Sequence, residues 1–379
     1  MYTEFLYCSL TKRFMKIKQS YISIISILNF ILLIIGCTGD EKYPIDKLVS
    51  VSYKSATDTS YVEITPSFTG FNNPTAILAG NDQLLYVADK NNNRLVQMNE
   101  AGIILETREI LQPIAIAQDL RLDLLVSGEM YYAASGDTIG VLFRIHLYEA
   151  KHHLADAKID TVWMEPSKPN RRFTGIGVLL ENQYFVVRDG PDNSSFIDPD
   201  SKVIWFDKND NRLTTLTDLT TRAGSGITDI LRPTGIAMFP NSNDFVLTQS
   251  SVDGTMPYGA LWMVYTKVPD EGWNPKFNPT KPEERYRDFI KPNRFIEPSA
   301  PVIDGSRLDI FIIDSKLDSL IKFDRRGNFK SESFGRAALQ LLGRPPMKNP
   351  KGVAFRVKTL YIADSGNDMI RRFRLSTDK

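Results

Sequence analysis

The stretch YVADKNNNRLVQM, Tyr86–Met98, returns near the end of the chain as YIADSGNDMIRRF, Tyr361–Phe373. Each stretch follows a proline-led phrase, NPTAILAGNDQLL from Asn73 and NPKGVAFRVKTL from Asn349. Four more phrases of this kind begin at Gln112, Phe173, Arg232 and Glu297. One unit that recurs with loops of variable length is typical of a repeat protein.

Each copy of the unit holds two short β-rich runs with a turn between them, and most copies continue into a third apolar run. Three such runs joined by turns predict antiparallel meander strands. The copies start 39 to 65 residues apart, at Pro74, Pro113, Thr174, Pro233, Pro298 and Pro350. Six four-stranded units predict an all-β, six-bladed β-propeller over residues 59–379, because a closed ring of blades leaves no long sheet edge exposed.

The last copy is shorter than the others, because the chain ends six residues after Phe373. The segment TSYVEITPSF, Thr59–Phe68, reads as a strand without a copy of its own. We predict that this N-terminal strand is the fourth strand of blade six and closes the ring, burying Tyr61, Val62 and Ile64. The alternative is an unpaired N-terminal strand, which would leave two sheet edges bare.

The repeated phrase Pro-x-Gly-(Ile/Val)-Ala followed by Tyr-(Val/Ile)-Ala-Asp-x-x-Asn resembles the NHL repeat. The resemblance is good in the first and last copies and weaker between them. It implies a β-propeller over residues 59–379. NHL propellers and their relatives include protein-binding and RNA-binding modules, lyases and lactonases, so the resemblance does not decide the function.

The N-terminal segment has the features of an export signal. Lys16 and Lys18 precede Tyr21–Ile35, an apolar run of 15 residues, which is short for a membrane span but suits a signal peptide. The run ends in Ile-Ile-Gly-Cys37, which resembles a bacterial lipobox. This resemblance implies a lipoprotein signal peptide over residues 1–36, with Met15 as a second candidate start, and an acylated Cys37. The alternative is an uncleaved signal anchor.

Residues 37–58 are polar and predict a tether. Asp40 and Glu41, close behind Cys37, resemble the surface-export signal of Bacteroidetes lipoproteins. The resemblance implies a protein of the bacterial cell envelope, anchored by lipid in the outer membrane and exposed at the surface.

Charge and cysteine content narrow the classes of partner. The whole chain carries a formal charge of +1, and removal of residues 1–36 leaves 42 basic and 44 acidic residues. A balance of this kind does not favour a nucleic-acid partner. Cys8 and Cys37 are the only cysteines, so the propeller holds neither a disulfide nor a thiolate metal site. We expect a monomer.

The repeats also suggest which side chains surround the central channel. The first residue of each inner strand should lie there, which gives a ring of Thr75, Ile114, Thr174, Thr234, Ser299 and Lys351. This ring has four hydroxyls and one cation but no carboxylate, unlike the oxygen-ligand set that a hard cation requires in lactonases. Asp89, Asp314 and Asp364 end second strands, where structural hydrogen bonds to turn N–H groups are expected.

Two other groups could bind a metal ion. His146, His152 and His153 all fall in blade two and its following loop, so they cannot surround an ion on the ring axis. A local site from His152 and His153 is the remaining alternative, although adjacent residues on a strand point to opposite faces. The loop Arg188–Lys202 is rich in aspartate and could hold Ca²⁺, although it lacks EF-hand spacing. A solvated turn-forming loop is the simpler interpretation, and we predict no cofactor.

The longest insertion between repeats, Tyr265–Phe295, contains five prolines and three aromatic residues without an obvious strand partner, Trp273, Phe277 and Tyr286. Together with Tyr258 they could form a rim of exposed rings that stacks on sugars or anchors a protein. Lys351 at the channel mouth is the next candidate ligand-binding residue. The alternative is that these aromatic residues pack the insertion onto blade four or five.

Two functions of different classes follow. We favour a membrane-anchored, non-catalytic NHL-like propeller that binds a protein, peptide or glycan through its loops. The alternative is a lactonase-like propeller hydrolase or lyase that acts at the central channel. The lack of a metal-ligand set and of a Gly-x-Ser-x-Gly motif favours the first function.

The first prediction concerns the anchor. Cys37→Ser should block lipid attachment and move the protein from the detergent phase to the aqueous phase, because the acyl chains hold it at the membrane. Incorporation of labelled palmitate in the native host measures this. A wild-type protein that takes up no label would refute the lipobox interpretation.

Overall fold

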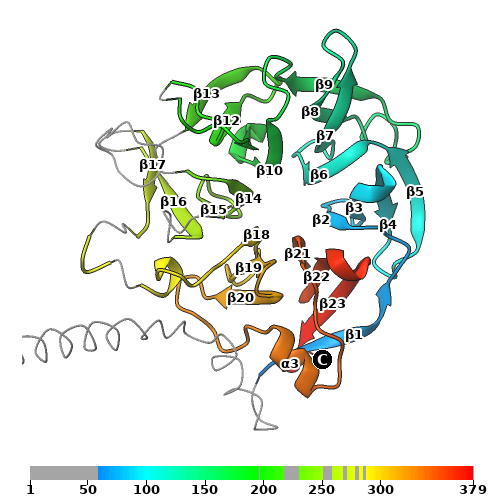
Figure 1. Cartoon of the computed structure of the whole chain (residues 1–379). Helices are drawn as coiled ribbons and strands as arrows, with labels where there is room; N and C mark the ends of the chain where they lie inside the picture. Colours follow the sequence, from blue (N-terminus) through cyan, green and yellow to red (C-terminus); the bar gives the residue numbers. More distant parts are fainter. Residues whose placement is uncertain are drawn as a thin grey trace, which may run out of the picture. The chain divides into compact units, whose positions relative to one another are not determined.

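The structure is a computed structural model that describes residues 59–378, apart from 196, 217–229, 251–257, 268–270, 278–280 and 285–286. The predicted signal peptide, Cys37, the tether and Tyr286 therefore lie outside the described residues. Six antiparallel sheets stand around a common centre as the blades of a propeller (Figure 1). The predicted all-β, six-bladed propeller is confirmed.

The blades follow one another along the chain, each with its first strand nearest the centre (Figure 1). Blade one is β2 (Pro74–Ala79), β3 (Leu85–Asp89), β4 (Arg94–Met98) and β5 (Ile104–Glu109). Blade two is β6 (Leu111–Gln118), β7 (Leu124–Tyr132), β8 (Asp137–Ile145) and β9 (Ile159–Met164). Blade three is β10 (Arg172–Val178), β11 (Tyr184–Asp189), β12 (Lys202–Phe206) and β13 (Arg212–Leu216).

The second half of the ring begins with blade four, which is β14 (Pro233–Met238), β15 (Phe245–Gln249), β16 (Ala260–Thr266) and β17 (Gly272–Pro275). Blade five is β18 (Pro298–Ile303), β19 (Ile310–Asp314) and β20 (Ser319–Phe323). Blade six is β21 (Gly352–Arg356), β22 (Thr359–Asp364), β23 (Met369–Leu375) and β1 (Tyr61–Phe68).

Short helices occur in the connections: η1 (Lys90–Asn92), η2 (Leu180–Asn182), η3 (Asp288–Ile290), α3 (Arg336–Leu341) and η4 (Ser365–Asn367). Within the described ranges, no helix has the length and apolar character that a membrane span requires.

Blade five departs from the predicted pattern of four strands, since its sheet has three. Beyond β20 the chain makes only single bridges to it, from Phe329 and Phe334. A turn between Lys330 and Ser333 interrupts the extended run, and the Ser333 hydroxyl accepts the backbone N–H of Lys322 at 2.9 Å. A side chain thus takes the place of a strand partner.

Strand β1 pairs antiparallel with β23, which makes the N-terminal strand the outermost strand of blade six (Figure 1). Tyr61 is buried and packs edge-on against Phe311, with ring centroids 6.0 Å apart. Glu63 accepts two hydrogen bonds of 2.8 Å from Arg371, which is 1% exposed. Val62, in contrast to our expectation, is 48% exposed, because its side chain points to the face of this outer strand opposite to that of Tyr61.

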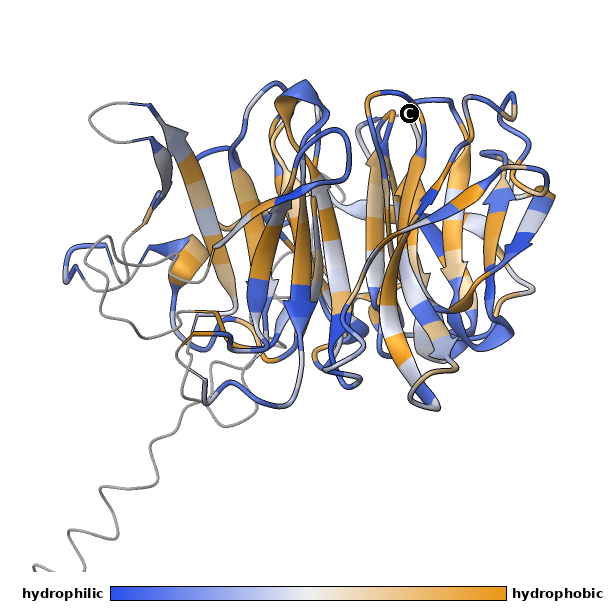
Figure 2. Ribbon diagram, turned by 90° about the horizontal axis from the view of Figure 1, so that it is seen from above, coloured by the Kyte–Doolittle hydropathy of each residue, from blue (hydrophilic) through white to orange (hydrophobic). Residues whose placement is uncertain are grey.

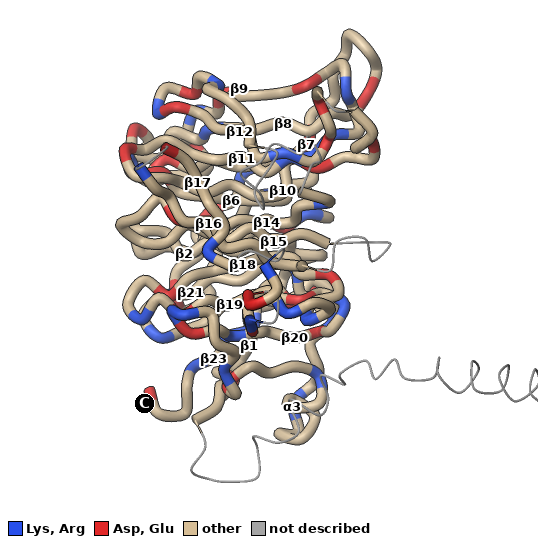
Figure 3. The backbone as a smooth tube through the Cα atoms, turned by 90° about the vertical axis from the view of Figure 1, so that its left-hand side faces the viewer, with Lys and Arg blue, Asp and Glu red and all other residues tan. Residues whose placement is uncertain are grey.

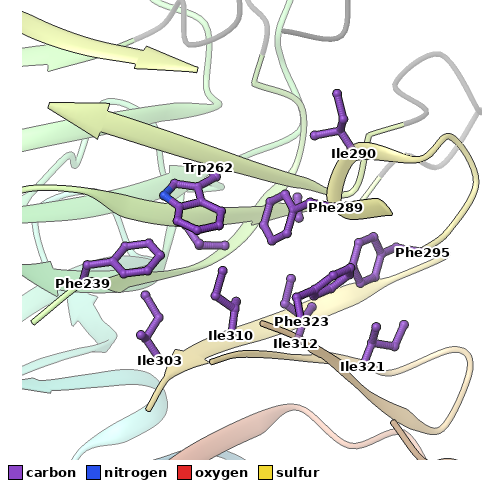
Figure 4. Close-up of a cluster of buried hydrophobic side chains, with 12 residues drawn as sticks. Phe239, Trp262, Phe289, Ile290, Phe295, Ile303, Ile310, Ile312, Ile321 and Phe323 are labelled. Atoms are coloured by element: carbon purple, nitrogen blue, oxygen red, sulfur yellow. The ribbon is translucent and has the colours of Figure 1, made fainter. Parts of the chain in front are cut away.

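The core lies in layers between neighbouring blades. Figure 2 shows apolar strands with mostly hydrophilic loops at their ends. Figure 4 shows one layer, in which Trp262 of blade four stacks on Phe239 at 4.7 Å and meets Phe289 edge-on at 5.6 Å. Ile303, Ile310 and other side chains of blade five complete this cluster. Each blade is therefore stabilised mainly by its two neighbours.

The glycine of the repeated phrase has a packing role. A Cβ atom on Gly175 would lie 3.0 Å from the Cα of Gly235, and one on Gly352 would lie 2.8 Å from the Cα of Ala76. Successive inner strands thus approach too closely for larger side chains. Blades one, two and five carry alanine at the matching position, at Ala76, Ala115 and Ala300.

The second prediction concerns β1. A chain that starts at residue 69 should lose several kcal/mol of unfolding free energy relative to one that starts at residue 59. Burial of an aromatic side chain such as Phe68 contributes about 1.5–3 kcal/mol, and loss of Glu63 leaves the buried Arg371 without its best partner. Urea denaturation of both chains measures the loss. Equal midpoints would show that ring closure does not depend on β1.

Candidate functional site

The hydroxyls predicted to line the channel form hydrogen bonds between neighbouring blades. At the end of the ring where the inner strands begin, which we name the proline end, a Thr or Ser hydroxyl donates to the carbonyl of the repeat proline in the next inner strand. The bonds run from Thr75 to Pro113 (2.9 Å), Thr174 to Pro233 (2.8 Å), Thr234 to Pro298 (2.6 Å) and Ser299 to Pro350 (3.2 Å). Four of the predicted polar groups are thereby occupied by structural hydrogen bonds.

The remaining two positions of the ring differ. Ile114 offers no hydroxyl, and at Lys351 the bond to the next blade comes instead from Ser365, whose hydroxyl donates to the carbonyl of Pro74. Lys351 is half-buried, and its Nζ lies 3.4 Å from the Ser315 hydroxyl. Among the described residues, it has no carboxylate within 4.0 Å.

Burial lowers the pKa of the Lys351 amine; Glu297 and Asp314 partly oppose this, while Lys90 adds to it. Such an amine loses its proton at a lower pH than an exposed lysine. It can bind an anion while charged and can attack a carbonyl carbon while neutral.

Trp273, the leading rim candidate, lies in β17, the outer strand of blade four. Its ring is half-buried and meets Phe185 at 5.0 Å and Trp205 at 5.1 Å, both in blade three. Its Nε1 donates to the Asn243 carbonyl at 2.7 Å. This placement agrees with the packing alternative, because the ring closes the apolar layer between two blades.

Phe277 follows β17 and also packs inward. Its ring centroid lies 6.0 Å from that of Trp262 and 6.2 Å from that of Phe289. Tyr258 is half-buried against the same cluster. The structure therefore places Trp273 on one layer and Phe277 with Tyr258 on the next, rather than bringing them to one exposed rim.

The aspartates at the ends of second strands have a structural role, as predicted, but the backbone N–H groups that Asp89 and Asp364 accept belong to the loop before the inner strand rather than to the expected hairpin turn. Asp89 accepts the backbone N–H of Asn72 at 2.7 Å, and Asp364 accepts that of Lys348 at 2.7 Å. Asp314 accepts four backbone N–H groups, from Ile296, Glu297, Lys316 and Leu317. Each aspartate thus holds the loop that leads into its own inner strand.

The acidic loop after β11 is part of a buried network of ion pairs. Arg171 donates to Glu165, Asp198 and Asp200, at 2.7–2.8 Å. Arg188 donates to Glu165 and Asp198, and Lys202 to Asp198 at 2.9 Å. The cations hold the pKa of the Asp198 carboxyl below its usual range, although burial opposes this. Because cations occupy these carboxylates, the loop does not favour Ca²⁺.

The histidines lie in the connection between β8 and β9, away from the ring axis. Each contacts a carboxylate: His146 meets Asp160 at 2.9 Å, His152 meets Asp82 at 3.2 Å and His153 meets Glu106 at 2.7 Å. Asp82 and Glu106 belong to blade one, so these pairs join blades one and two. Across the described part of the chain, no group of three His, Cys, Asp or Glu side chains has a geometry that suits a metal ion.

Along the backbone, basic and acidic positions are otherwise interspersed, as the blue and red segments in Figure 3 show. Sequence reasoning missed one arrangement, a pocket lined by Arg356, Arg372 and Arg374 at blade six. The alternation Arg372-Phe373-Arg374 was a usable signal, because residues two apart on a strand share a face.

Comparison with known proteins supports the fold. The chain matches no protein-family model and no curated protein sequence. Among solved structures, it is similar to a gluconolactonase from Xanthomonas campestris, with 12% identity, a TM-score of 0.52 and coverage of 84% of this chain and 90% of that one. A PQQ-bound aldose sugar dehydrogenase from Streptomyces coelicolor gives 12% identity, a TM-score of 0.54 and coverage of 84% and 99%.

A protein of unknown function from Bacteroides thetaiotaomicron gives 11% identity and a TM-score of 0.54, with coverage of 84% of this chain and 76% of that one. At these identities the similarity shows a shared fold. The chemistry has to be argued from the residues of the site.

The third prediction separates packing from ligand binding at Trp273. Trp273→Ala should lower the free energy of unfolding by about 3 kcal/mol, because it leaves a cavity between blades three and four. Trp273→Phe, the control, should lose much less. An unchanged melting temperature in Trp273→Ala would contradict the packing role and favour the exposed-rim hypothesis.

Proposed function

We propose that the propeller takes a small organic anion at the proline end of its ring, with Lys351 as the residue that meets the negative charge. We further propose that an acylated Cys37 holds this NHL-like propeller at the bacterial cell envelope. This proposed site corresponds to the lactonase-like alternative, which acts at the central channel, rather than to an aromatic rim.

One observation carries this proposal. Lys351 is the only cation among the six positions that start the inner strands, and no carboxylate of the described residues lies within 4.0 Å of its amine, although Glu297 and Asp314 act on it from further away. A half-buried ammonium group has lost part of its hydration, and a bound anion would compensate for that loss. The neighbouring hydroxyls are held in bonds between blades, so Lys351 is the polar group left to recognise a ligand.

A specific observation also favours a second function. This is a hydrolase or lyase reaction on a carbonyl compound at the same place. Burial lowers the pKa of Lys351, and a neutral amine is a base or a nucleophile toward a lactone carbonyl. The similarity to a gluconolactonase and an aldose sugar dehydrogenase is consistent with this function, although it concerns the fold.

Capture of a protein, peptide or glycan through the loops has less support. The aromatic rings predicted to contact such a ligand, those of Trp273 and Phe277, pack in the apolar layers between blades.

The fourth prediction tests Lys351 with gluconate as the probe. Lys351→Gln should weaken gluconate binding at least tenfold, since a hydrogen bond to a charged group contributes about 1.5–3 kcal/mol. Lys316→Gln, at an exposed lysine at the same end of the ring, is the matched control and should bind as the wild type does. Isothermal titration calorimetry measures both.

The pH dependence follows from the direction of the pKa shift. The positive charge is present below the lowered pKa of Lys351 and is lost as pH rises through it, so gluconate binding should weaken at a lower pH than an ordinary lysine would predict. Equal affinity of Lys351→Gln and wild type would refute the site. Hydrolysis of gluconolactone above the uncatalysed rate, abolished by Lys351→Gln, would establish the second function.

A further inference from the structure

A pocket of about 710 Å³ lies at blade six, away from the proline end. It is lined by β1, β22 and β23, by the turn between β21 and β22, and by Glu100 from the turn between β4 and β5 of blade one. Lys351 precedes β21, whereas Arg356 of this pocket ends that strand. The pocket and the Lys351 position are therefore separate sites.

Strand register places the cationic side chains of this pocket together. Arg372 stands opposite Ile64 on one side and Tyr361 on the other, and Arg374 stands opposite Val62 and Thr359. Residues two apart on a strand point to the same face, so both guanidinium groups belong to the face that lines the pocket. Arg374 is exposed, and its Nη2 donates to the Thr359 hydroxyl at 3.0 Å.

The carboxylates around the pocket already have cationic partners. Glu63 pairs with the buried Arg371 at 2.8 Å, and Glu100 pairs with Arg356 at 2.7 Å. Asp378 lies 3.4 Å from Arg307 and 3.6 Å from Lys358.

Arg372 and Arg374 have no carboxylate within 4.0 Å among the residues that the structure describes. Two neighbouring guanidinium groups are thus left with uncompensated charge.

Arg372 is also short of hydrogen-bond acceptors. Its Nη2 donates to the Pro66 carbonyl at 2.8 Å, and its guanidinium lies over the Phe68 ring at 4.3 Å. Its Nε is buried without any hydrogen-bond partner. Burial lowers the pKa of Arg372; Tyr361 opposes this effect and Arg374 adds to it. An anion in the pocket would offset the repulsion between the two arginines.

The other wall of the pocket is apolar. Val62 and Ile64 line it, and Val62 leaves 48% of its surface exposed. A pocket of several hundred Å³ with an apolar wall and a few convergent polar groups is typical of small-molecule sites. An inorganic ion would use the arginines but not this wall.

We propose that this pocket, which we name the arginine pocket, binds a small organic anion whose carboxylate or phosphate head contacts Arg372 and Arg374 while its apolar body lies against Val62 and Ile64. Guanidinium groups bind both kinds of head group in a bidentate manner, so they form the shared chemistry. The inference does not depend on the function proposed for Lys351.

The test uses the full chain and two probes, octanoate and inorganic phosphate, in isothermal titration calorimetry. Arg374→Gln and Arg372→Gln should each weaken octanoate binding at least tenfold. Arg121→Gln, at an exposed arginine of blade two, is the matched control and should leave it unchanged. Arg374 is exposed, so its variant should melt as the wild type does and reports binding without loss of fold.

The apolar wall is tested separately. Val62→Ser should weaken octanoate binding several-fold and leave phosphate binding unchanged, because only octanoate has a body to place there. If phosphate binds as tightly as octanoate and Val62→Ser has no effect, the site takes an inorganic anion and the organic-ligand proposal is wrong. If octanoate binds equally to wild type, Arg372→Gln and Arg374→Gln, the arginine pocket is not an anion site.

Discussion

Close approach of six inner strands around one axis is the constraint on which the rest of this structure depends. The backbones of Gly175 and Gly235, or of Gly352 and Ala76, come so near that a larger side chain has no room. The strands are joined at that end by hydroxyls that donate across to proline carbonyls. The recurring sequence of a proline, a hydroxyl residue and a small residue therefore reflects how the blades pack around the axis.

This constraint decides where function can be sought. Residues that recur in several blades form the hydrogen bonds that hold the ring, as the aspartates at the ends of second strands and the hydroxyls of the inner strands show. Residues that break the pattern are free of that requirement. Lys351 lies where four other blades have a hydroxyl, and the hydrogen bond to the next blade comes from Ser365 instead. A departure from the repeat is thus more informative about ligands than the repeat itself.

Charged residues divide in the same way between structure and recognition. Arg171, Arg188 and Arg371 are almost fully buried and meet carboxylates at hydrogen-bond distance, so their charges are balanced within the fold. Arg372 is the next residue after Arg371 but points to the other face of the strand, where no carboxylate of the described chain meets it. Arg371 and Arg372 are adjacent, yet the first forms an ion pair within the fold and the second is available to a ligand, because neighbouring residues of a strand point to opposite faces.

The sequence by itself determined the fold class, the number of blades and the structural role of the repeated aspartates, because strand periodicity and turn residues are local signals that recur in every copy. Four strands were predicted for blade five, where the Ser333 hydroxyl replaces a strand partner, and sequence does not reveal that a side chain will do so. The aromatic insertion looked exposed because its partners lie in other blades: Trp273 finds Phe185 and Trp205 only once blades three and four stand side by side. The arginine pocket likewise combines β1 with residues about 300 positions further along, so only tertiary structure could bring its apolar wall to its two uncompensated arginines.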